Sequence, residues 1–209
     1  MWIKICGLTT AAAVDAALAA GVDALGFVFA ASPRQLTPQA AVALARAARG
    51  RARCVAVMRH PSQGELDEVL SVFRPDLLQS DAADFTALRL PPSLGRLPVL
   101  RQAQAAAAAL PRRVLFEGPA SGSGTTSDWQ AAHALARRTE VILAGGLHAG
   151  NVAAALAAVA PFGVDVSSGV EERPGMKSIE RIAAFVSAVR AAAAAAAAAS
   201  AASATGGLP

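Results

Sequence analysis

Two side chains that end short apolar segments could together carry acid–base chemistry. Cys6 ends the segment Trp2–Cys6, where its thiol can act as a base or nucleophile if its pKa falls from about 8.5. Glu117 ends another apolar segment, where partial burial would raise the pKa of its carboxyl group and suit it to a general acid. A lone cysteine can equally be a small buried core residue, which is our interpretation of Cys54.

Other residues could bind an anionic substrate. Arg34 follows the segment Gly26–Phe29, and its guanidinium can donate two parallel hydrogen bonds to a carboxylate or phosphate, although a solvated loop arginine is the alternative. Small residues fill the segments Leu143–Leu147 and Asp165–Glu171, where backbone N–H groups can converge on an anion. Together, these two segments predict a phosphate site.

Eight short β-rich segments alternate with alanine-rich helical segments and must position these side chains. The predicted strands are 2–6, 24–29, 53–57, 77–79, 97–100, 114–117, 140–143 and 164–166. Eight strand–helix units in about two hundred residues predict an α/β fold, a single (βα)8 TIM barrel with catalytic residues at the C-terminal ends of its parallel strands. An open doubly wound sheet is the alternative, because the fourth and fifth units are weak: Pro98 interrupts one strand and 83–88 is short for a helix.

Local signals fix some helix ends. A helix is predicted over 62–73, where Ser62 and Glu65 have the spacing of a capping box. Gly21 and Gly50 follow helical segments, where a residue with positive φ is expected.

Composition narrows the class of protein. The chain has 209 residues, 54% hydrophobic and 16% charged, with a net charge of +4. The arginines are scattered without a basic run, so we expect an anionic small molecule as the partner and no nucleic acid. Two cysteines without a C-x-x-C motif, and no signal sequence, indicate a soluble cytoplasmic protein.

The composition changes near the C-terminus. We expect a barrel domain over residues 1–190, ending in a helix over 178–190, and then an alanine-rich helical extension and disordered tail over 191–209. The run Ala191–Ala199 is too short and too weakly hydrophobic for a membrane span. His60, His133 and His148 are dispersed, with only His148 assigned to a loop after a strand, so we expect no zinc site.

The motifs resemble those of the phosphoribosylanthranilate isomerases of tryptophan biosynthesis. The matching stretches are KICGLT at 4–9, GFVF with SPR at 26–34, GSG with DW at 122–129, LAGGL with NV at 143–152, and GVDVSSGVE with PGMKS at 163–178. KICG together with DVSSGVE and PG-x-K is a specific combination, whereas AGGL is shared by several phosphate-binding barrels.

The resemblance implies an Amadori rearrangement of N-(5′-phosphoribosyl)anthranilate to 1-(2-carboxyphenylamino)-1-deoxyribulose 5-phosphate. It implies that no metal or organic cofactor takes part, that Cys6 is the base, and that Arg34 faces the anthranilate carboxylate. It also implies that the phosphate is held by Gly145, Gly146, Ser168 and Gly169 and that Asp165 lies near the sugar hydroxyls. We expect a monomer or homodimer.

The sequence departs from the family's usual motifs at two places. The family's acid is usually an aspartate, whereas the aligned residue here is Glu117, whose extra methylene preserves the chemistry but changes the reach. The usual QLHG after the fourth strand appears as Gln79-Ser80-Asp81-Ala82. Asp81 is therefore a rival acid, ranked below Glu117 because we expect it in a solvated loop past the strand end.

Two other functions stay open. One is a phosphosugar isomerase of histidine biosynthesis, which relies on two carboxylates and is disfavoured by Cys6. The other is a non-catalytic phosphate-binding barrel in which Glu117 marks a lost activity.

Overall fold

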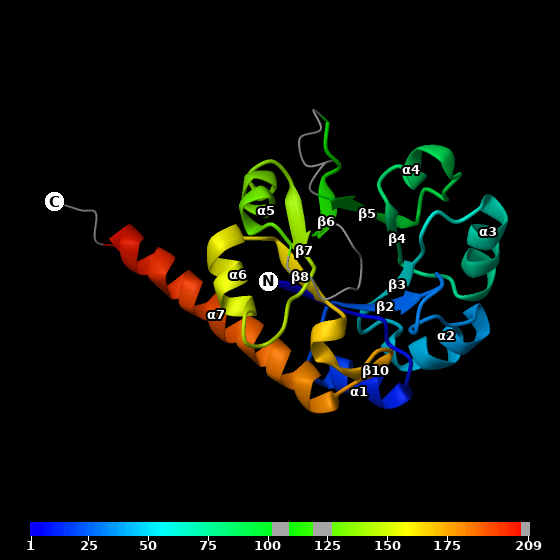
Figure 1. Cartoon of the computed structure of the whole chain (residues 1–209), viewed down its shortest axis with the longest axis horizontal. Coiled ribbons are helices and arrows are strands. Elements are labelled where there is room, and N and C mark those ends of the chain that lie inside the picture. The colour runs from blue at the N-terminus through cyan, green and yellow to red at the C-terminus, as the bar shows by residue number, and fades with distance from the viewer. Residues whose placement is uncertain (102–108, 119–126, 206–209) are drawn as a thin grey trace.

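Eight parallel strands close into a barrel in the computed structural model, which describes residues 1–101, 109–118 and 127–205 (Figure 1). The strands are β1 (Trp2–Cys6), β2 (Ala24–Val28), β3 (Arg53–Val57), β4 (Leu77–Asp81), β5 (Gly95–Arg101), β6 (Arg113–Glu117), β7 (Glu140–Leu143) and β8 (Gly163–Val166). Each strand pairs with the next, and β1 also pairs with β8. The predicted barrel is confirmed, and the open sheet is excluded.

The two weak units form strands despite their sequence signals. Pro98 lies inside β5, opposite Ser80 of β4. Strand β4 runs two residues further than predicted, because Ser80 and Asp81 continue the pairing with Pro98 and Val99. Asp81 is therefore the last residue of a strand and is only 7% exposed, so the expected solvated loop position is wrong.

Helices cover the outside of the barrel. They are α1 (Ala11–Ala19), α2 (Pro38–Ala45), α3 (Gln63–Val72), α4 (Asp84–Ala87), α5 (Trp129–Ala136), α6 (Val152–Val159) and α7 (Ile179–Thr205), with short 3-10 helices η1 (Arg46–Ala48) and η3 (Ser168–Val170). A short hairpin of β9 (Glu171–Arg173) and β10 (Met176–Lys177) follows η3. The glycines of the GSG motif at 122–124 lie outside the described residues.

The predicted local signals are present. Ser62 and Glu65 form a reciprocal capping box at the start of α3. Gly21 and Gly50 have φ values of +71° and +76°, the left-handed conformation that glycine adopts without steric cost.

Alternation along each strand separates the core from the barrel interior. Ile3 and Ile5 of β1 point outward and belong to the large apolar cluster between the strands and the helices. A smaller cluster fills the barrel interior: Leu97, Val99, Leu115, Ile142 and Ala144. Lys4 and Cys6 alternate with the two isoleucines, so β1 presents an amine and a thiol to the inside.

Helix α7 is longer than the barrel needs and extends away from it toward the C-terminus (Figure 1). Its residues Ile182, Phe185, Val186 and Val189 are buried against the barrel. The alanine run continues this helix, so among the described residues Ile179–Ala199 is one helix long and apolar enough to cross a membrane. The core helix of a soluble protein passes the same test.

Candidate active site

A pocket opens at the C-terminal ends of the strands, where a (βα)8 barrel carries its chemistry. Its lining residues come from seven of the eight strands and from the loops that follow the strands. Of the eight site residues assigned from the sequence, seven line it, and the rival acid Asp81 lines it as well. The seven are Cys6, Arg34, Glu117, Gly145, Gly146, Asp165 and Ser168. Gly169 is not among them.

Cys6 lies at the base of the pocket beside a buried ion pair. Lys4 Nζ lies 2.8 Å from Asp165 Oδ1, and the lysine side chain is fully buried. Burial raises the pKa of the Cys6 thiol, while the positive charges of Lys4 and Lys177 oppose that shift. Burial alone would lower the pKa of Lys4, but Asp165 and Cys6 outweigh it and raise that pKa above its ordinary value.

Gly26 on the neighbouring strand provides the space for this arrangement. A Cβ at this position would lie 3.0 Å from Cys6 Sγ and 3.1 Å from Lys4 Cε. A larger residue would therefore push the thiol and the amine out of their positions.

Glu117 lies at the pocket wall next to an arginine that sequence reasoning did not single out. Arg101, the last residue of β5, lies with its Nη2 3.1 Å from Glu117 Oε1 and also donates through Nη1 to Asp81 Oδ1. The two candidate acids thus share one guanidinium. Glu117 and Asp81, the two alternative acids of the sequence analysis, therefore lie in one cluster in the fold.

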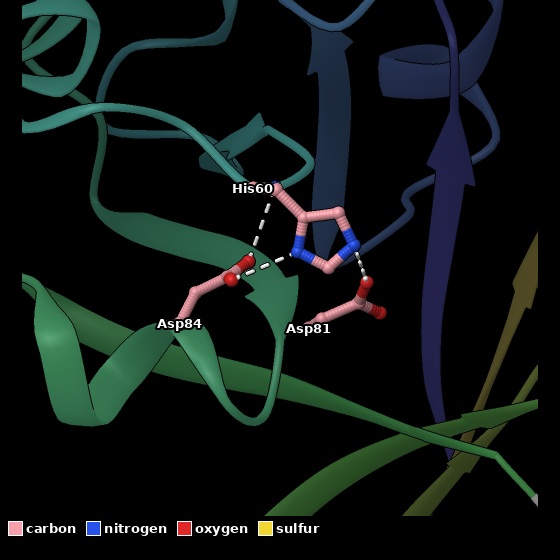
Figure 2. Close-up of side chains that lie close together, drawn as sticks. All are labelled: His60, Asp81 and Asp84. Carbon is pink, nitrogen blue, oxygen red and sulfur yellow. Dashed lines mark hydrogen bonds and ion pairs between the residues drawn. The ribbon is translucent and has the colours of Figure 1, made fainter.

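His60 extends this cluster on the other side of Asp81 (Figure 2). Its Nε2 lies 2.9 Å from Asp81 Oδ2, and its Nδ1 lies 3.0 Å from Asp84 Oδ1. His60 follows β3 by three residues, so the expectation that only His148 lies in a loop after a strand was wrong.

The grouping of His60, Asp81 and Asp84 has the composition of a metal site. Both ring nitrogens, however, face carboxylate oxygens, and Ser80 Oγ donates to the other oxygen of Asp84 at 2.5 Å. These side chains satisfy one another's hydrogen-bonding groups. We therefore assign no metal to the cluster.

The loops after β7 and β8 meet at the opposite side of the pocket. Gly145 and Gly146 have φ values of +89° and +62°, and the Gly146 carbonyl accepts a hydrogen bond from Asn151 Nδ2 at 2.8 Å. A Cβ at Gly169 would lie 1.9 Å from the Leu147 carbonyl oxygen. Gly169 thus allows the two loops to touch, and Ser168 beside it lines the pocket.

Arg34 is held by a partner on the hairpin after β8. Its Nε and Nη2 each donate to a different oxygen of Glu171 at 2.7 Å. Lys177 Nζ contacts the same carboxylate at 2.7 Å. Burial opposes ionisation of Glu171, but the hydrogen bonds from Arg34 and Lys177 outweigh it and hold its pKa below the ordinary value.

One further polar group faces the pocket. Gln79 is 7% exposed, and within the described part of the chain its Oε1 accepts no hydrogen bond. An unsatisfied buried acceptor costs free energy, and this one lines the pocket where a ligand could pair with it.

The fold and the pocket define a (βα)8-barrel enzyme with a thiol and carboxyl groups at the catalytic ends of its strands. The profile of the N-(5′-phosphoribosyl)anthranilate (PRA) isomerase family matches residues 3–188. The chain therefore belongs to this family of isomerases, which act in tryptophan biosynthesis.

Individual relatives agree with this assignment. The chain is 44% identical over 207 residues to the N-(5′-phosphoribosyl)anthranilate isomerase of Azorhizobium caulinodans, covering 90% of this chain and 91% of the relative. It is 40% identical to that of Rhizobium etli strain CIAT 652, covering 90% and 93%.

Solved structures of the family share the fold. The crystal structure of TrpF from Jonesia denitrificans is 36% identical with a TM-score of 0.76, covering 92% of this chain and 98% of that one. Phosphoribosyl anthranilate isomerase from Thermus thermophilus is 30% identical with a TM-score of 0.77, covering 91% and 99%. Family membership decides against the histidine-pathway relative and the non-catalytic barrel.

Proposed function

We propose that this chain converts N-(5′-phosphoribosyl)anthranilate to 1-(2-carboxyphenylamino)-1-deoxyribulose 5-phosphate with Glu117 as the acid and Cys6 as the base. The observation that carries the proposal is that both side chains line one pocket with the two glycine-containing loops after β7 and β8. This is the arrangement that acid–base catalysis on a phosphorylated sugar requires.

In the first step, the Glu117 carboxyl group gives its proton to the ribose ring oxygen. The C1′–O bond breaks as the nitrogen lone pair forms a C=N bond, which opens the ring to an iminium. The Cys6 thiolate then takes the proton from C2′, and the electrons of that C–H bond form the enolamine. Tautomerisation of the enolamine gives the ketose product, so the reaction is balanced without a redox partner.

The substrate's two anionic groups require two further contacts. Gly145, Gly146 and Ser168 are the proposed phosphate ligands, with Gly169 bringing the two loops together. Arg34 is the proposed partner of the anthranilate carboxylate, because its Nε and Nη2 donate to Glu171 whereas its Nη1 does not. Gln79 Oε1 offers an acceptor to a substrate N–H or O–H, and Asp165 lies at the pocket floor for the sugar hydroxyls.

Turnover of the phosphoribosyl substrate by Cys6→Ser and Glu117→Gln tests these roles. We expect both variants to lose activity while keeping the wild-type fold. Full activity in both would overturn the assignment of acid and base. Restored growth without tryptophan, in a strain lacking the isomerase, tests the substrate independently of the residues.

The cellular and oligomeric context is also a proposal. We place the chain in the cytoplasm, as expected for a biosynthetic enzyme, and as a monomer or homodimer. A crystal structure of monomers generated from the dimeric phosphoribosylanthranilate isomerase of Thermotoga maritima is 25% identical with a TM-score of 0.77. Sedimentation of the full chain measures the state directly.

A further inference from the structure

The two positions at which the sequence departs from the family's usual motifs meet on one side chain. Glu117 stands where the usual acid is an aspartate, and Asp81 stands in the altered QLHG motif. Arg101 lies between them and donates to both. We propose that Arg101 and Asp81 are positioning residues for the acid: Arg101 fixes the Glu117 carboxyl group at the pocket wall, and Asp81 fixes Arg101 and offsets its charge.

The proposal rests on the proposed role of Glu117, and the strand register supports it. Arg101 of β5 is paired with Glu117 of β6, and Asp81 of β4 is paired with Val99 of β5. The neighbouring strands β4, β5 and β6 therefore end with an aspartate, an arginine and a glutamate. The side chains are 8%, 23% and 12% exposed for Asp81, Arg101 and Glu117, so water screens their charges only in part.

The geometry of the guanidinium makes this contact directional. Nη1 donates to Asp81 and Nη2 to Glu117, so the planar fork holds the two carboxyl groups at a fixed angle. Aspartate at position 117 would be shorter by one methylene, about 1.5 Å, and would lose the 3.1 Å contact. The length of the glutamate side chain at this position therefore fits the contact with Arg101.

Asp81 is itself held from the other side. His60 Nε2 contacts its second oxygen at 2.9 Å, and Asp84 holds the same imidazole through Nδ1 at 3.0 Å (Figure 2). The His60 backbone N–H also donates to Asp84 at 3.2 Å. These contacts connect the loop after β3 to the end of β4. They fix the Asp81 carboxylate, which accepts the hydrogen bond from Arg101.

Charge explains why an arginine can lie beside a general acid. Arg101 alone would favour the ionised carboxylate, which has no proton to give. Asp81 shares the same guanidinium, so the positive charge of Arg101 is divided between two carboxylates and favours ionisation of Glu117 less than an unshared arginine would. On the β7 side of Glu117, Leu143 at the end of the strand and Ala144 after it are uncharged.

Other charged groups that line the pocket or contact its lining are already paired or lie at its rim. Lys4 pairs with Asp165, and Arg34 pairs with Glu171, which also contacts Lys177. Arg59 lines the pocket from the loop after β3 and is exposed. Among the described residues, Arg101 contacts Glu117 directly and Asp81 acts on it through the shared guanidinium.

The test is the pH profile of kcat/KM in Arg101→Met and Asp81→Asn. The productive form needs a protonated Glu117 and an ionised Cys6. A carboxyl group ordinarily has a lower pKa than a thiol, and burial raises the pKa of the Cys6 thiol further. In the bell-shaped profile we therefore assign the acid limb to Glu117 and the alkaline limb to Cys6.

The two variants should move the acid limb in opposite directions. Loss of the arginine charge should move it to higher pH and loss of the aspartate charge to lower pH, each by about 0.5–1 pH unit. Each variant should also lose about 10- to 100-fold in kcat, because the acid is no longer held in place. Arg101→Lys keeps the charge without the fork, so we expect it to restore the limb but not the full kcat.

Arg96→Met is the matched control, because Arg96 is exposed at the other end of the same strand. It should leave both limbs in place. Acid limbs that stay fixed, or move in one direction, in folded Arg101→Met and Asp81→Asn would overturn the positioning role. Full activity in Glu117→Gln would instead overturn the proposed function, so the two failures are distinguishable. If Arg101→Met does not fold, Asp81→Asn and Arg101→Lys carry the test.

Discussion

Lys4 and Asp165 face each other across the seam where the first and last strands of the barrel join. They occupy matched positions in the β1–β8 register, with 2.8 Å between Nζ and Oδ1. The lysine is fully buried, and Asp165 is 7% exposed. This pair places a positive charge next to the Cys6 thiol without leaving that charge unpaired in the barrel.

Removal of one partner should therefore be more harmful than removal of both. In Lys4→Met, Asp165 becomes a buried carboxylate without its counter-charge, and we expect a loss of about 3–5 kcal/mol in the free energy of unfolding. The double variant Lys4→Met/Asp165→Asn should recover part of this loss. Urea unfolding of both variants measures this recovery. A double variant no more stable than Lys4→Met would contradict the prediction.

Cys6→Ser should lower kcat/KM by roughly 10²- to 10⁴-fold, because a serine hydroxyl is a far weaker base than a thiolate. Cys54→Ala is the matched control. Cys54 is also a buried thiol but lies near the start of β3, at the opposite end of the barrel. It should cost stability through lost packing and leave kcat unchanged.

Glu171 should contribute to stability at neutral pH and lose that contribution on acidification. Its pKa is lower in the folded state than its ordinary value, so its stabilisation is present above the unfolded-state pKa of about 4.3 and disappears as pH falls through the folded-state value. The gap in unfolding free energy between wild type and Glu171→Gln should narrow from pH 7 to pH 3. A constant gap across this range would contradict the assignment.

Gly169→Ala should weaken substrate binding more than it slows chemistry. A methyl group 1.9 Å from the Leu147 carbonyl oxygen must push the loops after β7 and β8 apart and open the proposed phosphate site. We expect KM to rise by about tenfold or more with a smaller change in kcat. Gly64→Ala, where the added methyl group meets no atom within 4 Å, should change neither constant.

The alanine-rich end of α7 should be dispensable for activity. Arg190 Nη2 donates to the Gly21 carbonyl at 3.0 Å, and Ala192 packs against the core. A chain that ends after Ala193 keeps these contacts and should retain its kcat and its melting temperature. A truncation that inactivates the enzyme would show that residues beyond 193 have a role.

The sequence was sufficient where the relevant signal is local. Cys6 and Glu117 end apolar strands, the two glycine-containing loops follow the last strands, and the capping box at Ser62 is complete within four residues. The roles of Lys4, Arg101 and His60 depend instead on side chains brought together by closure of the barrel. Lys4 and Asp165 are 161 residues apart, so no local pattern connects them. Asp81 was misplaced because the end of a strand depends on its neighbour's pairing.

The seam between β1 and β8 also has a consequence for biosynthesis of the protein. Cys6 is translated more than 150 residues before Asp165, Ser168 and Lys177. A nascent chain that has not yet emerged past β8 has no closed barrel and cannot form the Lys4–Asp165 pair. The buried environment of Cys6 therefore forms only after β8 has been synthesised, and shorter nascent chains should carry an ordinary thiol.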